Sequence, residues 1–156
     1  MTQAVLLFLS LFVLSAPSLA GSLVGITSDE LQALQKKGAA VVDIRTPQEW
    51  AATGVIQGSH ELTFFDTSGQ YDKEAWLKSL KLMLGKKDQP VVLVCRSGNR
   101  SALVGKMMTS EAGFDRVYHL EKGIREWSAQ SLPLTPGCAT TATCAASPAR
   151  PASAAP

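Results

Sequence analysis

The stretch VVLVCRSGNRS, at residues 91–101, joins a strand, a loop and the start of a helix. Residues 91–94 are all aliphatic and mostly β-branched, a run typical of a strand that is covered on both faces. Apolar side chains then recur at helical spacing between residues 101 and 112, and Gly113 provides a helix end. The stretch therefore predicts a strand that leads through a tight loop into a helix, as in a parallel α/β sheet.

The same alternation continues on both sides of this stretch. Further strands are predicted at residues 41–44, 60–65 and 117–120. A helix is predicted from a capping box at residues 27–30 to Gly38, and a short helical turn is predicted at 47–50, where Pro47 takes the first position. Two further helices are predicted at 72–84 and 123–128. Short strands separated by helices predict an α/β fold, a parallel sheet with helices on both faces.

Charge is confined to the middle of the chain. The 156 residues carry 15 basic and 13 acidic side chains, for a net charge of +2. This balance argues against nucleic-acid binding, which requires a clustered basic excess. All the charges except that of Arg150 fall within residues 21–132, which predicts one globular domain over that range.

Residues 1–20 are uncharged and read as a secretory signal peptide. Positions 4–14 are almost all apolar, and small residues precede the expected cleavage site after Ala20. The alternative is an uncleaved membrane anchor, but the apolar stretch is shorter than the roughly 20 residues that a span needs. The sequence thus predicts export to a bacterial periplasm, without stable membrane association after cleavage.

Residues 133–156 are rich in alanine and proline, and they predict a disordered tail. The tail contains Cys138 and Cys144, which could form a disulfide in an oxidising compartment or have no role. A metal site is a weaker interpretation, because two cysteines supply only half of the usual ligands. We expect neither a metal nor another cofactor.

The loop after the 91–94 strand is the candidate site. Backbone N–H groups and the following helix N-terminus can converge there on an anion, and Arg96 and Arg100 add positive charge. Cys95 at that point is predicted to have a lowered pKa and to exist largely as thiolate. Gly98 suits a backbone that must turn with positive φ. The alternative is a buried structural thiol.

Four blocks of the sequence resemble the single-domain rhodaneses, or thiosulfate sulfurtransferases. They are VVDIRTPQEW at 41–50, GVIQGS at 54–59, VVLVCRSGNRS at 91–101 and GIREW at 123–127. With its exported leader the chain is most similar to periplasmic rhodaneses of the phage-shock type. The resemblance implies a rhodanese-like parallel sheet of about five strands and a cysteine that carries sulfane sulfur as a persulfide. His60 departs from the family, which usually has a small apolar residue there.

The expected reaction begins with attack of the Cys95 thiolate on thiosulfate. Loop residues Arg96, Ser97, Gly98, Asn99 and Arg100 are the candidate substrate-binding residues. The persulfide then passes its sulfur to a thiophilic acceptor, cyanide or a thiol. No general base is expected, because the thiolate is already formed. His60 and His119 are predicted to be surface or strand residues away from the loop.

Three neighbours of the motif are given structural roles. Asp43 and Arg45 are expected to fix their loop by hydrogen bonds, and Glu49 is expected to pair with Arg45. Trp50, Trp76 and Trp127 are predicted to belong to the core or its rim.

Two other functional classes remain open beside the sulfurtransferase. One is a persulfide relay or partner-binding rhodanese module, whose protein partner the sequence does not identify. The other is a cysteine phosphatase or arsenate reductase, which uses a loop of Cys, five residues and Arg. Here Arg100 comes one position early, and the shorter loop suits a single sulfur atom better than a phosphate.

Overall fold

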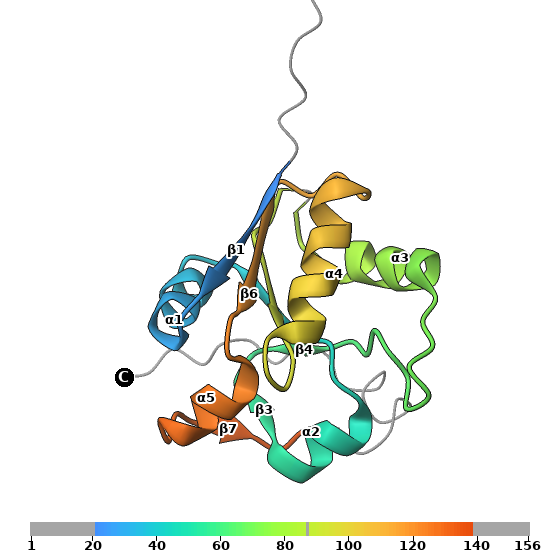
Figure 1. The fold of residues 1–156 in the computed structure, drawn as a ribbon. Helices are drawn as coiled ribbons and strands as arrows, with labels where there is room; N and C mark the ends of the chain where they lie inside the picture. Colours follow the sequence, from blue (N-terminus) through green and yellow to red (C-terminus); the bar gives the residue numbers. More distant parts are fainter. Residues whose placement is uncertain (1–20, 87, 139–156) are drawn as a thin grey trace, which may run out of the picture.

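The computed structural model describes residues 21–86 and 88–138. A sheet of five parallel strands runs through the centre, in the order β1-β6-β5-β2-β4 (Figure 1). The strands are β1 Ser22–Ile26, β2 Ala40–Asp43, β4 His60–Glu61, β5 Val91–Val94 and β6 Arg116–Leu120. The predicted fold class is confirmed. Because β5 is the central strand, the residue that follows it, Cys95, lies at the middle of the carboxyl edge.

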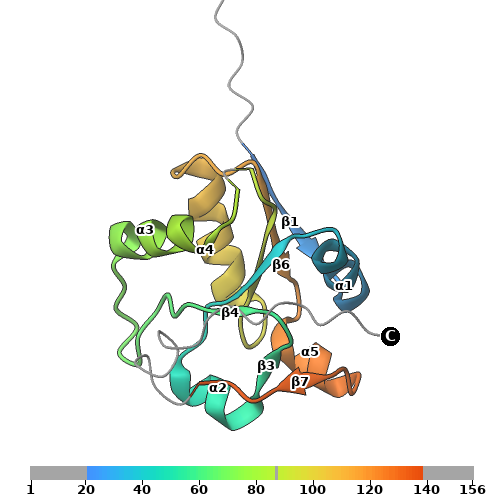
Figure 2. The ribbon, with the colours of Figure 1, turned by 180° about the vertical axis from the view of Figure 1, so that it is seen from behind.

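Helices cover both faces of this sheet. They are α1 Ser28–Lys36, α2 Pro47–Thr53, α3 Lys73–Met83, α4 Asn99–Ser110 and α5 Gly123–Ala129. Figures 1 and 2 show α3 and α4 on one side of the sheet, and α1 and α5 on the other. None of the helices within 21–86 and 88–138 is long and apolar enough to cross a membrane.

Two hydrophobic clusters follow from the alternation of side chains along β5. Val91, Leu93 and Cys95 face α3 and α4, whereas Val92 and Val94 face α1 and α5. All four strand residues have no exposed surface. The predicted core tryptophans are also buried: Trp76 lies in the first cluster, Trp127 in the second, and Trp50 is only 1% exposed.

Several elements differ from the sequence-based expectation, among them β3 (Val55–Ile56), which was not predicted. β1 was not predicted, because it is an edge strand with mostly exposed side chains, and within residues 21–86 and 88–138 it pairs only with β6. The strand expected at 60–65 is limited to His60–Glu61. The turn expected at 47–50 continues as a helix to Thr53, supported by a capping box between Thr46 and Glu49.

The predicted boundary of the tail also needs correction. Residues Leu134–Thr135 form strand β7, which pairs antiparallel with β3 (Val55–Ile56) in a second small sheet. The Trp127 indole Nε1 donates a hydrogen bond to the Pro133 carbonyl at 3.1 Å. The backbone N–H of Cys138 donates to the Glu61 carboxylate at 3.0 Å. The folded part therefore extends beyond residue 132 to at least Cys138, because these backbone and side-chain bonds hold it to the domain.

The expected signal peptide at 1–20, the rest of the predicted tail and Cys144 lie outside the described residues.

Candidate functional site

The loop that follows β5 bends sharply around the sulfur of Cys95. The Cys95 side chain belongs to the buried cluster beneath α4 and is 1% exposed. Its Sγ accepts hydrogen bonds from the backbone N–H of Gly98 at 3.2 Å and of Ser101 at 3.4 Å. Helix α4 begins at Asn99, within the predicted loop. Its N-terminal N–H groups therefore point at the sulfur, an arrangement that favours negative charge on that atom.

Two glycines allow this loop to lie against the segment between β6 and α5. Gly98 has a φ of 91°, and a Cβ atom there would overlap the Glu121 carbonyl. Gly123 has a φ of 64°, and a Cβ there would lie 2.5 Å from the Arg96 carbonyl. The N–H groups of Ile124 and Arg125 donate to the Cys95 and Arg96 carbonyls at 2.9 and 3.2 Å. The start of α5 thus fixes the shape of the loop.

We expect Gly98→Ala to displace the loop and to reduce reactivity at Cys95. The left-handed backbone alone costs an L-residue about 1–2 kcal/mol, and the overlap with Glu121 adds to this. The matched control is Gly113→Ala, which has a φ of 70° but nothing within 4 Å of the added Cβ. Urea unfolding and alkylation of Cys95 would compare the two variants. Normal alkylation in a folded Gly98→Ala protein would contradict this account of the loop.

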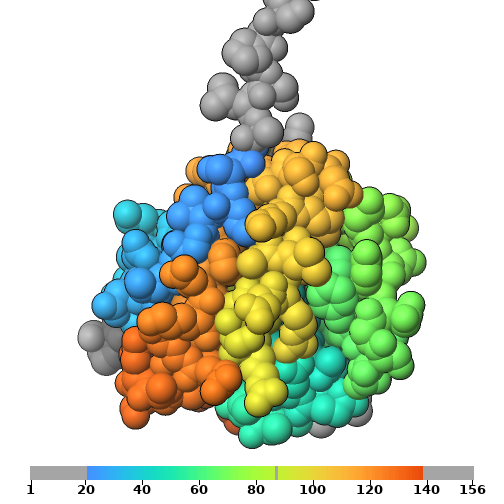
Figure 3. All heavy atoms as spheres, in the orientation of Figure 1, coloured from blue at the N-terminus to red at the C-terminus, as the bar shows by residue number. Residues whose placement is uncertain are grey.

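The other predicted binding residues lie around the loop at different depths. Arg96, Ser97 and Asn99 are exposed, Gly98 is buried, and Arg100 is partly buried. In Figure 3 the yellow atoms of the loop and the start of α4 lie between the orange segment of α5 and the teal segment of α2. The Arg96 side chain is exposed, whereas that of Cys95 is buried, so the Arg96 charge can attract anions from solvent.

Arg100 is engaged by Glu49 of α2, which corrects the predicted pairing of Glu49 with Arg45. The Arg100 guanidinium donates two parallel hydrogen bonds to the carboxylate, at 2.6 and 2.9 Å. Partial burial raises the pKa of Glu49. The opposing effects of the Arg100 hydrogen bonds, the Thr46 backbone N–H and the nearby arginine charges are larger together, so this pKa lies below its ordinary value. The two-pronged pair ties α2 to the start of α4.

Arg45 turns away from Glu49's carboxylate and into the protein. It is 1% exposed, and its guanidinium bonds the equally buried Asp43 carboxylate through Nε at 2.9 Å and Nη2 at 2.6 Å. The remaining donors reach the Thr53 hydroxyl and the backbone carbonyls of Gly54 and Glu49. The structural role expected for Asp43 and Arg45 is therefore confirmed. Together they fix the connection from β2 to α2, which in turn places Glu49 beside Arg100.

A histidine lies close to the loop, contrary to expectation. His119 Nδ1 is 3.5 Å from Ser101 Oγ, and that oxygen is 3.4 Å from Cys95 Sγ. His119 is in strand β6 as predicted, opposite Leu93 of β5 in the sheet register. The expectation failed because the sequence gives no register between strands. His60, by contrast, lies in β4 next to Val42 of β2.

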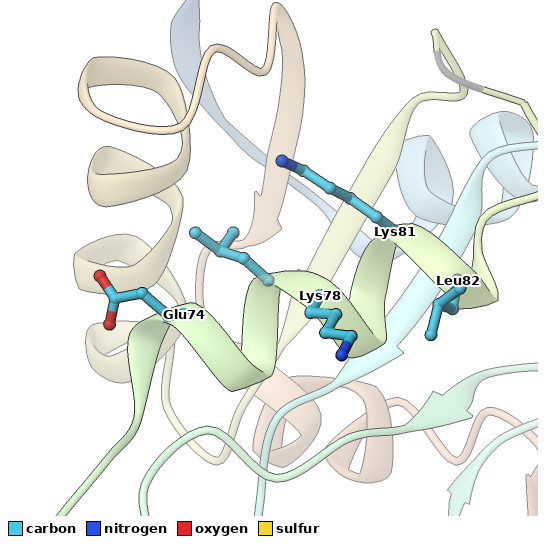
Figure 4. Close-up of a pocket in the computed structure, with 5 residues that line it drawn as sticks. Glu74, Lys78, Lys81 and Leu82 are labelled. Atoms are coloured by element: carbon cyan, nitrogen blue, oxygen red, sulfur yellow. The ribbon is translucent and has the colours of Figure 1, made fainter.

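Two surface depressions in the described part of the chain lie away from the loop. A groove of about 740 Å³ runs between α4 and the segment from Phe64 to Glu74, and shares Phe64 and Val104 with the cluster around Cys95. A second depression of about 440 Å³ lies on the outer face of α3, where Glu74, Lys78, Lys81 and Leu82 project from one helix without converging (Figure 4). The convergence of polar groups is at Cys95.

Comparison with known proteins decides the family. Residues 27–130 match the rhodanese-like domain, which is two thirds of the chain. The chain belongs to the rhodanese-like family. Its rhodanese-like domain is 35% identical over 102 residues to the thiosulfate sulfurtransferase GlpE of Pseudomonas fluorescens, covering 65% of this chain and 82% of that one.

Solved structures show the same fold. A Mycobacterium tuberculosis protein is 25% identical with a TM-score of 0.63, covering 75% of this chain and 99% of that one. A Rhodopseudomonas palustris protein of unknown function, a possible tyrosine phosphatase, is 29% identical with a TM-score of 0.54, covering 72% of this chain and 85% of that one.

Proposed function

We propose that this rhodanese-like domain is a thiosulfate sulfurtransferase in which Cys95 carries the transferred sulfur as a persulfide. The observation that supports this most is the pair of backbone N–H groups, from Gly98 and Ser101, that converge on Cys95 Sγ. Such donors stabilise an anionic sulfur in the way that an oxyanion hole stabilises oxygen. The similarity to a thiosulfate sulfurtransferase points to the same chemistry.

The proposed reaction has two steps. The Cys95 thiolate attacks the outer sulfur of thiosulfate, forming an S–S bond, and the sulfur–sulfur bond of thiosulfate breaks with its electron pair leaving on sulfite. A nucleophile then attacks the outer sulfur of the persulfide, giving thiocyanate from cyanide or a new persulfide from a thiolate. Cys95 thiolate is regenerated. The proposed partners are thus a small sulfur donor and a thiol acceptor.

We assign different roles to the two arginines. Arg96 is exposed and draws the thiosulfate dianion toward the loop. Arg100 is held by two hydrogen bonds to Glu49, so its charge is fixed near Cys95 rather than free to move with the ligand. The loop residues Ser97, Gly98 and Asn99 shape the backbone around the sulfur. The persulfide relay or binding module remains the alternative role for the same cysteine.

Phosphatase chemistry is the second candidate, because one structural neighbour is a possible tyrosine phosphatase. Two features disfavour it here. Arg100 follows Cys95 by five positions rather than six, and its guanidinium fork is occupied by the Glu49 carboxylate. A phosphate would need that fork for its own oxygens.

We therefore expect thiocyanate formation from thiosulfate and cyanide, with negligible aryl-phosphate hydrolysis and no arsenate reduction. The measurement is a set of parallel rates on the same protein preparation, each repeated with Cys95→Ser. Phosphatase turnover that is lost in Cys95→Ser, without thiocyanate formation by the parent protein, would overturn the proposal in favour of phosphate chemistry.

We also propose that the protein acts in the periplasm, on the basis of the leader at residues 1–20. Expressed in a bacterial host with this leader, the exported chain is expected to begin at Gly21 and to appear in the periplasmic fraction. N-terminal sequencing tests this directly. A chain that keeps Met1 and fractionates with membranes would instead indicate an anchor.

A further inference from the structure

We propose that Ser101 and His119 form a proton relay that takes the proton of the Cys95 thiol to solvent. The inference rests on the proposed function only in treating Cys95 as the nucleophile, and it concerns how the thiolate forms. Ser101 touches the reacting sulfur, whereas His119 is a positioning residue that acts through the Ser101 hydroxyl.

The surroundings of Cys95 leave one route for the proton among the described residues. The side chain is 1% exposed, so bulk water has almost no access to it. Of the hydrogen-bonding groups that contact Sγ, the N–H groups of Gly98 and Ser101 are donors and cannot accept a proton. The Ser101 hydroxyl, 3.4 Å away, can both accept and donate.

Ser101 cannot keep the proton or pass it directly to water. Its side chain is in α4 and has no exposed surface. Its hydroxyl donates a hydrogen bond to the Gly98 carbonyl at 2.9 Å, and its Oγ lies 3.5 Å from His119 Nδ1, toward which the hydroxyl can turn. A backbone carbonyl is not a base at neutral pH, but an imidazole nitrogen is. The Ser101 hydroxyl therefore bridges the buried sulfur and the imidazole.

His119 is suited to receive a proton and to release it. Desolvation lowers the pKa of His119 below its ordinary value of 6.5, although the Glu121 carboxylate and the Gly98 carbonyl oppose this and Lys106 of α4 reinforces it. The imidazole is therefore neutral at neutral pH. Its other nitrogen, Nε2, lies beside Gly25 of β1, and the Glu121 side chain lies beside the same glycine. His119 is only half-buried, so it can exchange protons with solvent.

The step balances without an external reactant. The Cys95 S–H proton moves to Ser101 Oγ while the Ser101 hydroxyl proton moves to His119 Nδ1. The products are a thiolate, which the Gly98 and Ser101 N–H groups stabilise, and an imidazolium, which Glu121 stabilises. After the thiolate has reacted, the imidazolium loses its proton to solvent.

The test is the rate of Cys95 alkylation by iodoacetamide between about pH 5 and pH 9, where histidine titrates. Trypsin releases Cys95 in the peptide of residues 88–96, which contains neither Cys138 nor Cys144, so mass spectrometry reports this thiol alone. The variants are His119→Asn, which keeps a polar atom near Nδ1 but cannot take a proton, and Ser101→Ala. The matched control is His60→Asn, because the pKa of His60 is also lowered by burial.

In the parent protein and in His60→Asn, we expect the rate to fall as the pH drops through the lowered pKa of His119, and to be level above it. Without the relay, the change in rate at the pKa of His119 should be absent. Near pH 6.5 both relay variants should react at least about tenfold more slowly than the parent. Thermal unfolding tests whether each variant is folded. If His119→Asn does not fold, the pH profile of Ser101→Ala, which lacks only one oxygen atom, provides the test of the relay.

A His119→Asn or Ser101→Ala profile that coincides with that of the parent would overturn the relay and show that the loop alone forms the thiolate. Because alkylation requires no thiosulfate, the outcome is independent of sulfur transfer. A relay confirmed in a protein without thiocyanate formation would leave the inference standing and remove the proposed function.

Discussion

Cys95→Ser is expected to abolish thiocyanate formation, lowering the rate by at least about a thousandfold. A serine hydroxyl remains protonated at neutral pH and cannot form a stable persulfide analogue, so the first step of the reaction is lost. The fold should persist, because the smaller hydroxyl oxygen can accept the same Gly98 and Ser101 N–H groups that now bond Sγ. Steady-state rates and a thermal unfolding curve measure both effects.

The control for this variant uses the other two cysteines. Replacing Cys138 and Cys144 together by serine should leave the rate within about twofold, because neither lies in the loop and the surrounding charges are unchanged. If Cys95→Ser kept most of its activity while this double variant lost it, the site would have been assigned to the wrong end of the chain.

Asp43→Ala is expected to destabilise the domain by about 3–5 kcal/mol, the cost of leaving a buried charge without its partner. Asp43 and Arg45 are each 1% exposed, and the carboxylate receives three hydrogen bonds from the Arg45 side chain. Without Asp43, the guanidinium must stay buried uncompensated or leave the interior, and its bonds to Thr53 and Gly54 would be strained or lost. Urea unfolding gives the free-energy change directly.

A surface pair serves as the control for Asp43→Ala. Lys122, 71% exposed, bonds Glu126 one helical turn away. Lys122→Ala should change the free energy of unfolding by less than about 1 kcal/mol, because an exposed pair gains little over hydrated charges. Equal effects of the two substitutions would show that burial of the Asp43–Arg45 pair does not decide its contribution to stability.

The elements nearest the site were the most predictable from sequence. The β5 strand is an uninterrupted apolar run, and Gly98 marks the one loop position that requires positive φ. These are local signals, since each depends on the residue types within a few positions. The same holds for the α1 capping box, where Thr27 pairs with Glu30. The α2 capping box between Thr46 and Glu49 was not predicted.

The contacts that complete the site depend on tertiary structure and were missed. Glu49 and Arg100 are 51 positions apart, and only the packing of α2 against the start of α4 brings them together. Proximity in sequence instead suggested Arg45, whose guanidinium is drawn inward by the buried Asp43. His119 reaches Ser101 because β6 pairs with β5 in a register that hydrophobic pattern does not specify.

The edge elements were missed for a different reason. β1 mixes small and apolar residues without regular alternation, and most of its side chains are exposed, so its hydrophobic pattern is too weak to predict a strand. β7 is a two-residue strand in a proline-rich segment, and its order comes from pairing with β3 and from the indole of Trp127. In both cases a partner strand supplies what local sequence does not.

The central claim, that Cys95 carries sulfane sulfur, is tested most directly by the mass of the protein after incubation with thiosulfate alone. We predict that the intact protein gains one sulfur atom, that the peptide of residues 88–96 contains it, and that cyanide removes it while thiocyanate appears. No added sulfur, or sulfur found only on the peptide that carries Cys138 and Cys144, would contradict the claim.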